Sequence, residues 1–481
     1  MSVDLATQAG EFFATRRCET PRGRLLLLSR HFPPGQAAGA RRWEKLAHFA
    51  ARRGWGLDVV TLAPADLESR DDRRLESLPE SVRVFGVPAR DHLLSRSAER
   101  LWEALRRLRP VRAGRDEGQA TAESESADPS RLRRENVVRM GYGPSVWLSS
   151  LRAIVEISNE SAWADAAAGA ARRIVDPSTH RAIISCGPPH MIHDSARVLS
   201  RRTGIPLVLD LRDAWSRIER VLYSFATPLW YQLAERIESR AFAHASLVVM
   251  NTPAAREVMC RVYPAIAEKI ISVTNGFDEM EVPSGPRELA FVIAFAGSIY
   301  IDRSPRNLFR AVRRVSNELG LDAAKLRVEL MGSFDVSMIR EMSRAEGVEN
   351  QVVLRPPGSG RDVAALLGRS AMLVNLAQDS DLAIPSKIFE YMVFPAWLLV
   401  LATRESATAQ ALEGTDAFVV DPEDVTRMSD VIRESFLTFQ RGGRPRPVAR
   451  DPRHGRTYQA ELLFDALDRC LADPASESAG G

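Results

Sequence analysis

The chain of 481 residues carries 65 basic and 62 acidic side chains, so its net charge is only +3. Hydrophobic residues make up 45% and charged residues 26%, a globular mixture that excludes a disordered, fibrous or collagen-like protein. At about 150 residues per domain, the length suggests two or three domains. Because the charge is balanced, no overall basic field indicates a nucleic-acid partner, and we expect none.

The composition also bears on location and on metal binding. The four cysteines, at positions 18, 186, 260 and 470, are far apart and form no CxxC pair. They predict neither a zinc site nor a disulfide framework, and so favour the cytoplasm. The N-terminus lacks the apolar run of a signal peptide. The longest aliphatic run, near residues 397–401, is far shorter than the roughly 20 residues that span a bilayer.

Only four of the basic residues are lysines, at positions 45, 269, 325 and 387, and all the others are arginines. A bias of this kind most simply reflects the base composition of the genome. An ordinary arginine here therefore carries little functional information, whereas a lysine within a motif attracts attention.

Short apolar runs alternate with amphipathic stretches along most of the chain, which predicts buried parallel strands joined by helices. The first series of predicted strands comprises residues 24–30, 58–62, 82–87, 182–185, 206–211 and 247–250. After a Pro- and Gly-containing break at 281–289, a second series comprises residues 291–297, 326–332, 352–356, 371–377, 396–402 and 417–420. We predict two Rossmann-like α/β domains that face a cleft.

The predicted boundaries follow from these series. Residues 1–22 form a flexible tail, 23–282 the first domain and 290–455 the second domain. A C-terminal helix at 456–472 returns to the first domain, and 473–481 form a second flexible tail. The polar segment 111–131 is predicted to be a disordered insertion. The helix predicted at 91–109 either packs on the domain or attaches to a membrane surface, although Glu99 and Glu103 dilute its positive face.

The segment 379–392, DSDLAIPSKIFEYM, follows a predicted strand and opens a helix at Pro385 or Ser386. Ser386 is a suitable N-cap, and free N–H groups at a helix start hold anions such as a diphosphate. Lys387 in the first turn opposes the helix dipole unless a phosphate is bound there. Glu390, on the same face one turn later, is placed to accept hydrogen bonds from a ribose diol. The alternative is a surface lysine beside a solvated glutamate.

This segment resembles the donor-site motif of retaining GT-B glycosyltransferases, in particular glycosyltransferase family 4 and its bacterial surface-polysaccharide branch. The resemblance extends from about residue 22 to 470. It implies that Glu390 binds the nucleotide ribose and that Pro385, Ser386 and Lys387 bind the donor. The segment AFAGSIYIDRSPRNLFRAV is similar to the family's first strand, loop and helix of the donor domain, so Gly297, Ser298 and Arg303 join the expected donor site.

Further segments resemble the first domain of the same family. The opening strand, loop and helix contain Gly39, which would let the backbone approach the donor phosphate and sugar or would simply form a flexible turn. IISCGPPHMIH and LVLDLRDAW are also similar to family segments, and VTNGFD matches the motif before the interdomain linker.

The acceptor side offers several alternatives. Asp213 follows the 206–211 strand, where open α/β sheets bind ligands. It would orient or deprotonate the acceptor hydroxyl, support the positively charged sugar, or pair with Arg212. His190 would contact the acceptor or the donor phosphate, or cap the helix that it opens. Arg212 is the second acceptor-side candidate.

Transfer from a nucleoside diphosphate leaves a dianionic diphosphate through an oxocarbenium-like transition state. Arg303 and Lys387 are the cations expected to stabilise it, and with Asp213 they form the predicted catalytic set. We expect no metal and no cofactor, a nucleotide-sugar donor, and a glycan, lipid-linked or small-molecule acceptor. Contact with the inner face of the membrane remains open.

The chain departs from the family in three places. Leu382 occupies the position of a second acidic residue, with Asp381 beside it. Ser298 stands where many members carry arginine. The sequence VFPAW follows the motif in place of Ala-x-Gly-x-Pro.

The main functional hypothesis is an active retaining glycosyltransferase. A GT-B protein without turnover, acting as a nucleotide-sugar-binding partner of another transferase, is the alternative. A nucleotide-sugar epimerase or sugar-phosphate synthase is a third candidate. A Rossmann dehydrogenase is disfavoured because no GxGxxG follows the first strand.

Overall fold

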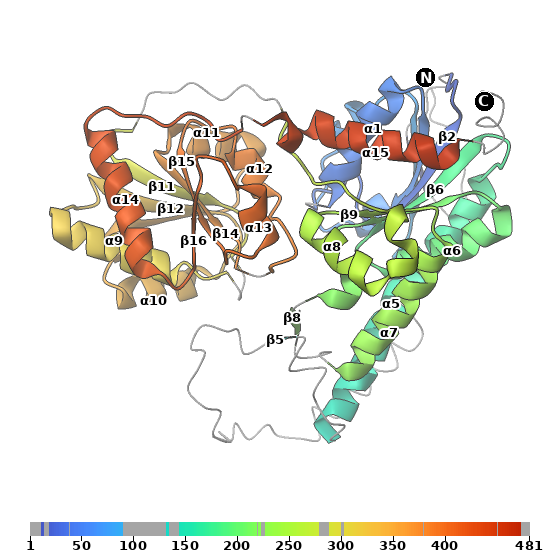
Figure 1. Cartoon of the computed structure of the whole chain (residues 1–481), viewed down its shortest axis with the longest axis horizontal. Coiled ribbons are helices and arrows are strands. Elements are labelled where there is room, and N and C mark those ends of the chain that lie inside the picture. Colours follow the sequence, from blue (N-terminus) through green and yellow to red (C-terminus); the bar gives the residue numbers. More distant parts are fainter. Residues whose placement is uncertain are drawn as a thin grey trace. The chain divides into compact units, whose positions relative to one another are not determined.

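The computed structural model describes residues 11–13, 19–37, 39–89, 131–133, 144–218, 220–222, 227–278, 288–299, 303–378, 380–449 and 451–472. The chain divides into two compact units (Figure 1). Unit 1 comprises residues 1–273 and 460–481, and unit 2 comprises residues 274–459. The helix predicted at 91–109, the insertion predicted at 111–131 up to residue 130, and the tail 473–481 lie outside the described residues.

Unit 1 is built on an eight-stranded sheet with the order β1-β4-β3-β2-β6-β7-β9-β10. All neighbouring strands are parallel except β1, which pairs antiparallel with β4. The strands are β1 (Glu11–Phe13), β2 (Arg24–Ser29), β3 (Gly56–Leu62), β4 (Val82–Val87), β6 (His180–Gly187), β7 (Leu207–Leu211), β9 (Leu247–Met250) and β10 (Ile270–Ser272). A separate antiparallel pair joins β5 (Arg131–Arg133) to β8 (Arg220–Leu222).

Helices cover both faces of this sheet because each strand buries side chains on both sides. One face packs against α1 (Ala40–Arg52) and the C-terminal helix α15 (Arg456–Leu471), in a core that includes Leu25, Leu27 and Trp43. Helices α5 (Pro144–Ile174) and α6 (Met191–Thr203) contact the strands as well. The remaining helices of unit 1 are α2 (Arg73–Glu76), α7 (Pro228–His244) and α8 (Pro253–Val262).

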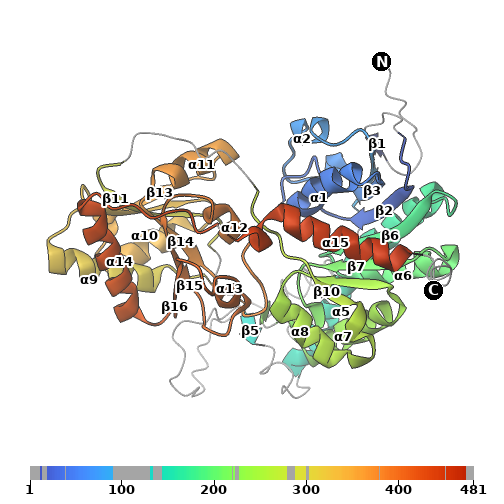
Figure 2. The same cartoon turned by 45° about the horizontal axis from the view of Figure 1, so that its top comes forward.

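Helix α15 lies alongside α1 in unit 1 (Figure 2), and both apolar and ionic contacts attach it there. Leu463, Phe464 and Leu467 are buried in the same core as β2 and α1. On the other side of the contact, Arg53 forms ion pairs with Glu461, Asp465 and Asp468 of the helix. The C-terminal helix therefore returns to the first domain, as the sequence predicts.

Unit 2 is a six-stranded sheet with the order β13-β12-β11-β14-β15-β16, in which all neighbours are parallel. Its strands are β11 (Phe291–Ala296), β12 (Leu326–Met331), β13 (Val352–Arg355), β14 (Met372–Leu376), β15 (Trp397–Leu401) and β16 (Phe418–Val420). Its helices are α9 (Arg306–Leu319), α10 (Val336–Ala345), α11 (Gly360–Arg369), α12 (Lys387–Tyr391), α13 (Ala407–Ala411) and α14 (Val425–Gln440). The strand order reverses direction between β11 and β14, the point where such sheets bind ligands.

Each predicted strand of both series is confirmed, and every one joins a parallel sheet. The structure adds β1 within the predicted tail 1–22, and it places Arg131, the last residue of the predicted insertion, in β5. Helix α5 was not predicted, because its apolar residues are spread around the helix and show no amphipathic period. None of the helices in the described part of the chain combines the length and apolar character that a membrane crossing requires.

The apolar face of α15 should contribute most of its attachment to unit 1. Phe464 is fully buried, so Phe464→Ala is expected to lower the free energy of unfolding by about 3–5 kcal/mol. Leu462, 38% exposed on the same helix, provides the matched control, and Leu462→Ala should cost much less. Urea titration followed by circular dichroism measures both, and equal losses in the two variants would contradict this packing.

Candidate functional site

Lys387 and Glu390 lie on one face of the short helix α12, which follows β14 and the loop after it. Their side chains are paired, with 2.5 Å between Lys387 Nζ and Glu390 Oε2. Each side chain is about one-third exposed, at 31% and 32%. The predicted common face is therefore confirmed, and the ion pair also offsets the unfavourable charge of a lysine in the first helical turn.

The start of α12 differs from the prediction. Ser386 occupies the N-cap position, but its backbone is already helical and its side chain accepts no capping hydrogen bond. The helix spans only Lys387–Tyr391, so few peptide dipoles add along its axis. The expected Ser386 cap is thus wrong, and Lys387, rather than the helix start, is the group of this segment suited to an anion. Pro385, the residue before Ser386, is partly buried, whereas Ser386 is exposed.

Tyr391 connects α12 to the carboxyl end of the central strand β11. Its buried hydroxyl accepts a hydrogen bond from the Ala296 amide at 2.6 Å and donates one to the Ala296 carbonyl at 3.0 Å. Burial raises the pKa of this hydroxyl, and the charge of Glu390 raises it as well, whereas Arg303 lowers it. Arg303 lies in the loop after β11 and Glu390 follows β14, the neighbouring strand, so both lie at the carboxyl edge of the unit 2 sheet.

The loop after β11 contains the other predicted donor residues. Gly297 follows the strand directly, and its carbonyl occupies the space that a side chain at Gly332 would need. Gly332, after the adjacent strand β12, has φ of +146°, so two glycines let these loops approach closely. Ser298 is exposed and Arg303 partly buried. Gln378 after β14 accepts a hydrogen bond from the Ser304 amide at 2.8 Å, which anchors the end of this loop.

Two of the departures from the family motif have structural explanations. The Thr403 hydroxyl donates a hydrogen bond to Asp381 Oδ1 at 2.6 Å, which ties that carboxylate to the loop after β15. Trp397 of VFPAW is the first residue of β15 and packs against Phe291, with ring centroids 5.8 Å apart. This tryptophan contributes to the core of unit 2.

In unit 1, a buried ion pair joins α1 to β7. Arg42 donates hydrogen bonds to both carboxylate oxygens of Asp210, at 2.9 Å from Nε to Oδ2 and 2.9 Å from Nη2 to Oδ1. Trp43 Nε1 donates to Asp210 Oδ2 at 2.7 Å. The Arg42 and Asp210 side chains are 4% and 1% exposed, so the pair is enclosed by protein and the helix is held tightly on the strand.

This ion pair brings Gly39 and Arg212 together. Gly39 is the N-cap of α1, and a β-carbon there would overlap Arg212 Nη1 and lie 2.9 Å from its Cζ. The φ of Gly39 is −61°, so its conformation does not require glycine, and the close approach of the guanidinium does. Arg212 is directed at Gly39, and no ion pair with Asp213 forms among the described residues. The predicted pairing of the two neighbours is therefore wrong. Asp213 is partly buried in the bend after β7.

His190 lies in the loop after β6, next to Arg212 in the sheet order. It occupies the N-cap position of α6 without a side-chain capping bond, so the predicted capping role is wrong. Its ring stacks on Trp215, with centroids 5.3 Å apart and planes inclined by 13°. Burial holds the pKa of His190 well below its usual range, and the charges of His193 and Arg212 lower it further. The imidazole is therefore neutral near pH 7.

Two further histidines, His31 and His193, lie near the same carboxyl edge of the unit 1 sheet. His193 hydrogen-bonds to Ser185 through Nδ1 at 2.8 Å, and burial lowers its pKa to about 4. His31, in the loop after β2, also has a pKa of about 4, because of burial first and then the charges of Arg212 and Arg30.

Sequence reasoning assigned no role to Tyr391, His31, His193 or Trp215. Tyr391 and Trp215 lie within motifs quoted above, and this position was the feature of the sequence that could have indicated a role for them. His193 also lies within a quoted motif, IISCGPPHMIH, whereas His31 had no such signal, because the arginine charges and the burial that lower its pKa come partly from other segments.

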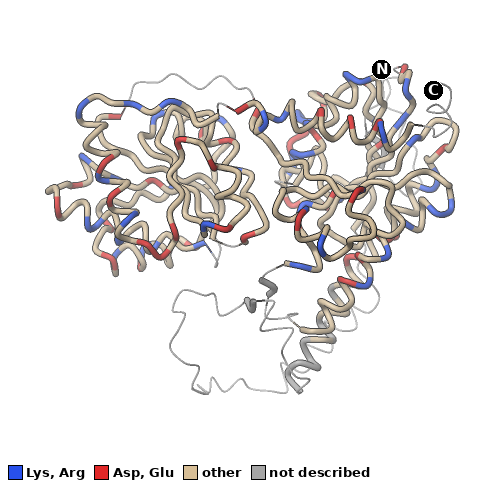
Figure 3. Tube along the Cα trace, viewed as in Figure 1, with Lys and Arg blue, Asp and Glu red and all other residues tan. Residues whose placement is uncertain are grey.

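The charged residues of both signs are interleaved along the two units (Figure 3). No group of three or more His, Cys, Asp or Glu side chains suited to a metal ion occurs among the described residues. The expectation of a metal-free site stays a prediction.

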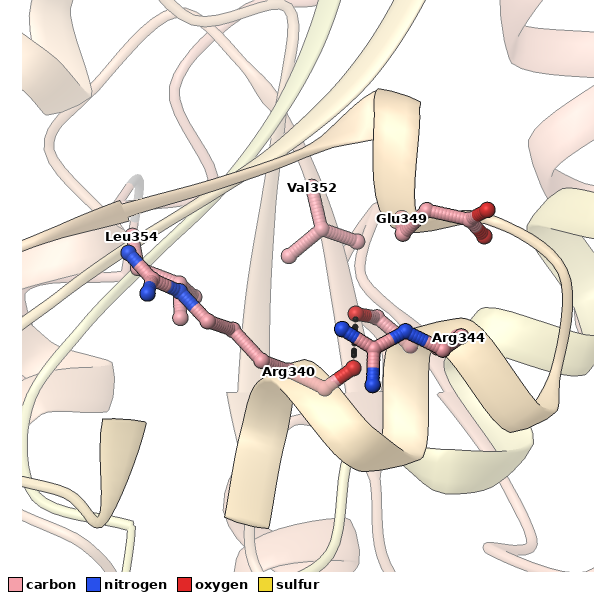
Figure 4. A pocket seen from close by; sticks show the side chains of 6 residues that line it. Arg340, Arg344, Glu349, Val352 and Leu354 are labelled. Carbon is pink, nitrogen blue, oxygen red and sulfur yellow. Dashed lines mark hydrogen bonds between the residues drawn. The ribbon is translucent and has the colours of Figure 1, made fainter. Parts of the chain in front are cut away.

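A cavity of about 210 Å³ lies between α10 and the edge strand β13 in unit 2 (Figure 4). Its lining residues are Arg340, Ser343, Arg344, Glu349, Val352 and Leu354. The Ser343 hydroxyl donates to the Arg340 carbonyl at 2.9 Å within it. The cavity contains none of the predicted site residues.

Comparison with solved structures identifies similar folds at low sequence identity. HepE from Anabaena, determined in complex with UDP, has a TM-score of 0.53 and 14% identity, covering 95% of this chain and 99% of its own. The lipopolysaccharide outer core galactosyltransferase WaaB, in its apo form, has a TM-score of 0.51 and 10% identity over 93% and 99%. A UDP-forming α,α-trehalose-phosphate synthase from Burkholderia xenovorans has a TM-score of 0.57 and 11% identity over 94% and 100%.

No family model matches the sequence. No curated protein matches it either. The structural similarity therefore establishes the fold, and the chain has the GT-B fold of these glycosyltransferases, with two parallel Rossmann-like sheets and a C-terminal helix that contacts the first.

Removal of the Tyr391 hydroxyl should destabilise unit 2. In Tyr391→Phe, the buried amide and carbonyl of Ala296 lose this partner, which is expected to cost about 1–3 kcal/mol of unfolding free energy. Tyr458, which is 40% exposed, is the matched control, and Tyr458→Phe should change stability little. Urea unfolding followed by fluorescence measures the difference, and equal stability of Tyr391→Phe and the parent protein would refute the bridging role.

Proposed function

We propose that the protein is a glycosyltransferase of the family 4 type, which moves a sugar from a nucleotide-sugar donor to a glycan, lipid-linked or small-molecule acceptor with retention of anomeric configuration. The observation that carries this proposal is that the Lys387–Glu390 pair and Arg303 follow β14 and β11, neighbouring strands whose carboxyl ends form the ligand-binding edge of the unit 2 sheet. The GT-B fold supports it, as does the UDP complex of HepE.

The chemistry of the reaction matches these side chains. Breakage of the anomeric C–O bond leaves the electron pair on the diphosphate, whose negative charge grows in the transition state. Lys387 and Arg303 are the cations that would stabilise this charge without a metal ion. Glu390 would accept hydrogen bonds from the ribose hydroxyls. Because Lys387 and Glu390 now pair with each other at 2.5 Å, donor binding would exchange that ion pair for a phosphate contact and a ribose contact.

The acceptor would bind to unit 1. Gly39, His190, Arg212 and Asp213 follow β2, β6 and β7, neighbouring strands whose carboxyl ends lie side by side. Asp213 would orient the acceptor hydroxyl or support the sugar as positive charge develops. A retaining transfer forms a bond from the acceptor oxygen to the anomeric carbon, and the acceptor proton leaves to the departing diphosphate or to a base.

A panel of nucleotide sugars tests the proposal directly. A thermal-shift screen identifies the donor first, since a ligand at 100 times its Kd adds about 2.7 kcal/mol of stability. The donor is then incubated with candidate acceptors, and release of nucleoside diphosphate is measured. Transfer to an acceptor supports the proposal. Epimerisation of the sugar, the activity named for a putative UDP-N-acetylglucosamine 2-epimerase of similar fold, would replace it, and tight binding without release would favour an inactive partner protein.

Glu390→Gln should weaken donor binding while the fold stays intact. Each hydrogen bond to a charged acceptor contributes about 1.5–3 kcal/mol, so Kd for the donor is expected to rise at least tenfold. Glu341, exposed on α10 in the same unit, is the matched control, and Glu341→Gln should bind the donor normally. Isothermal titration calorimetry measures both, and an unchanged Kd in Glu390→Gln would argue against the assigned donor site.

Lys387→Ala should slow transfer by 10²-fold or more at saturating donor, because one lost charge-stabilising donor costs about 3 kcal/mol in the transition state. Arg303→Ala should behave similarly, and Lys387→Arg should recover only part of the rate, because a guanidinium is larger and prefers bidentate geometry. Exposed Lys325 provides the control, and Lys325→Ala should have normal kcat. Near-normal turnover of Lys387→Ala would show that this lysine is only a surface charge.

A further inference from the structure

Arg212 lacks the partners that other arginines of unit 1 have. Arg42 is paired with Asp210, Arg53 with three carboxylates of α15, and Arg74 with Glu44. Among the residues that the structure describes, no ion pair and no side-chain hydrogen bond involves the Arg212 guanidinium, which is nevertheless partly buried. A guanidinium removed from water without a counter-charge is costly, so the site favours an anion.

No carboxylate is paired with Arg212 among the residues that the structure describes. Asp210, two residues earlier, is already occupied by Arg42 and Trp43. Besides burial, the charge of Arg212 lowers the pKa of His31 and of His190, and both imidazoles are neutral near pH 7. Arg212 also acts on the Cys186 thiol, whose pKa burial raises, so the thiol is uncharged too. His31, His190 and Cys186 therefore supply no counter-charge to Arg212.

His190 offers a second polar group at the same place. Its side chain is 95% buried, and its Nδ1 atom has no hydrogen-bond partner among the described residues. Stacking on Trp215 fixes the plane of the ring. A β-carbon at Gly187 would lie 3.0 Å from this nitrogen, so the glycine leaves the space beside it open. A buried nitrogen that lacks a hydrogen-bond partner and has a fixed orientation can form that hydrogen bond with a ligand.

The three strands that carry these residues end in register. Ser29 of β2 pairs with Cys186 of β6, and Gly187 of β6 pairs with Leu211 of β7. His31, His190 and Arg212 follow within three residues of those strand ends. Gly39 keeps the start of α1 clear of the Arg212 guanidinium. The arrangement is thus built by four separate segments of unit 1.

We propose that Arg212, together with His190 and His31, forms a subsite in unit 1 for a phosphate group of a substrate. The proposal rests on the proposed function for its substrates, since the phosphate belongs either to a phosphate-bearing acceptor or to the donor diphosphate. The guanidinium fork binds two phosphate oxygens. His190 Nδ1 donates to a third oxygen in the tautomer that carries the proton on Nδ1, and accepts from a neighbouring hydroxyl in the other tautomer.

The test uses the full chain, with inorganic phosphate and UDP as separate probes in isothermal titration calorimetry. Arg212→Gln should weaken phosphate binding at least about tenfold, and Arg212→Lys should be intermediate, because it keeps the charge but loses the fork. Arg202, exposed on α6, provides the control, and Arg202→Gln should bind both probes normally. Repeating the phosphate titration in the Lys387→Ala background separates this subsite from the donor cations.

The two sources of phosphate give different results. Loss of phosphate affinity with unchanged UDP affinity assigns the subsite to the acceptor, whereas a parallel loss of UDP affinity assigns it to the donor diphosphate. Unchanged affinity for both probes in Arg212→Gln, or no binding of either probe to the parent protein, overturns the proposal. Neither result depends on turnover, so the subsite can fail while the transferase activity stands, and the reverse.

Discussion

The buried ion pair between Arg42 and Asp210 determines how the functional edge of unit 1 is assembled. It joins the first turn of α1 to the centre of the sheet, with both side chains almost fully enclosed. Breaking a buried pair of this kind by removing one partner typically costs about 3–5 kcal/mol, because a charge is left uncompensated. Gly39 lies three residues before Arg42, and Arg212 lies two residues after Asp210. The ion pair thus sets the approach of Gly39 to Arg212, whose guanidinium we assign to a ligand of unit 1.

In unit 2, neutral hydrogen bonds rather than an ion pair attach the corresponding helix, α12, to the sheet. Tyr391 holds α12 to the end of β11 through both backbone groups of Ala296, while the charges of Lys387, Glu390 and Arg303 stay partly exposed. The uncharged Tyr391 hydroxyl holds the helix in place, so none of the charged side chains is needed for this attachment. Under the proposed function, the structural role falls on Tyr391 and the electrostatic role on Lys387 and Arg303, so the two roles belong to different residues.

Sequence reasoning located the strands of both units and the common face of Lys387 and Glu390. It failed where side chains had to be oriented. Ser386 and His190 occupy N-cap positions, as the spacing suggested, yet neither side chain forms a capping bond. Arg212 and Asp213 are adjacent in sequence, yet the guanidinium lies against Gly39 instead. Trp397, which departs from the family motif, packs in the core. For His190, Arg212 and Trp397, a contact with another segment of the chain replaced the local preference, whereas Ser386 makes no capping bond because its own backbone is already helical.

The sequence by itself determined the strand series and the point at which the chain changes from one sheet to the other. Buried parallel strands are apolar on both faces, so they can be recognised in the sequence as short hydrophobic runs. The tertiary structure alone decided which charges are structural. Arg42 and Arg212 are indistinguishable in a sequence so rich in arginine, and the partner of Arg42 is 168 residues away. Ion pairing at that separation depends on how strands are ordered in the sheet, which no local pattern encodes, and so only the fold separates an arginine that holds the protein together from one left available for a ligand.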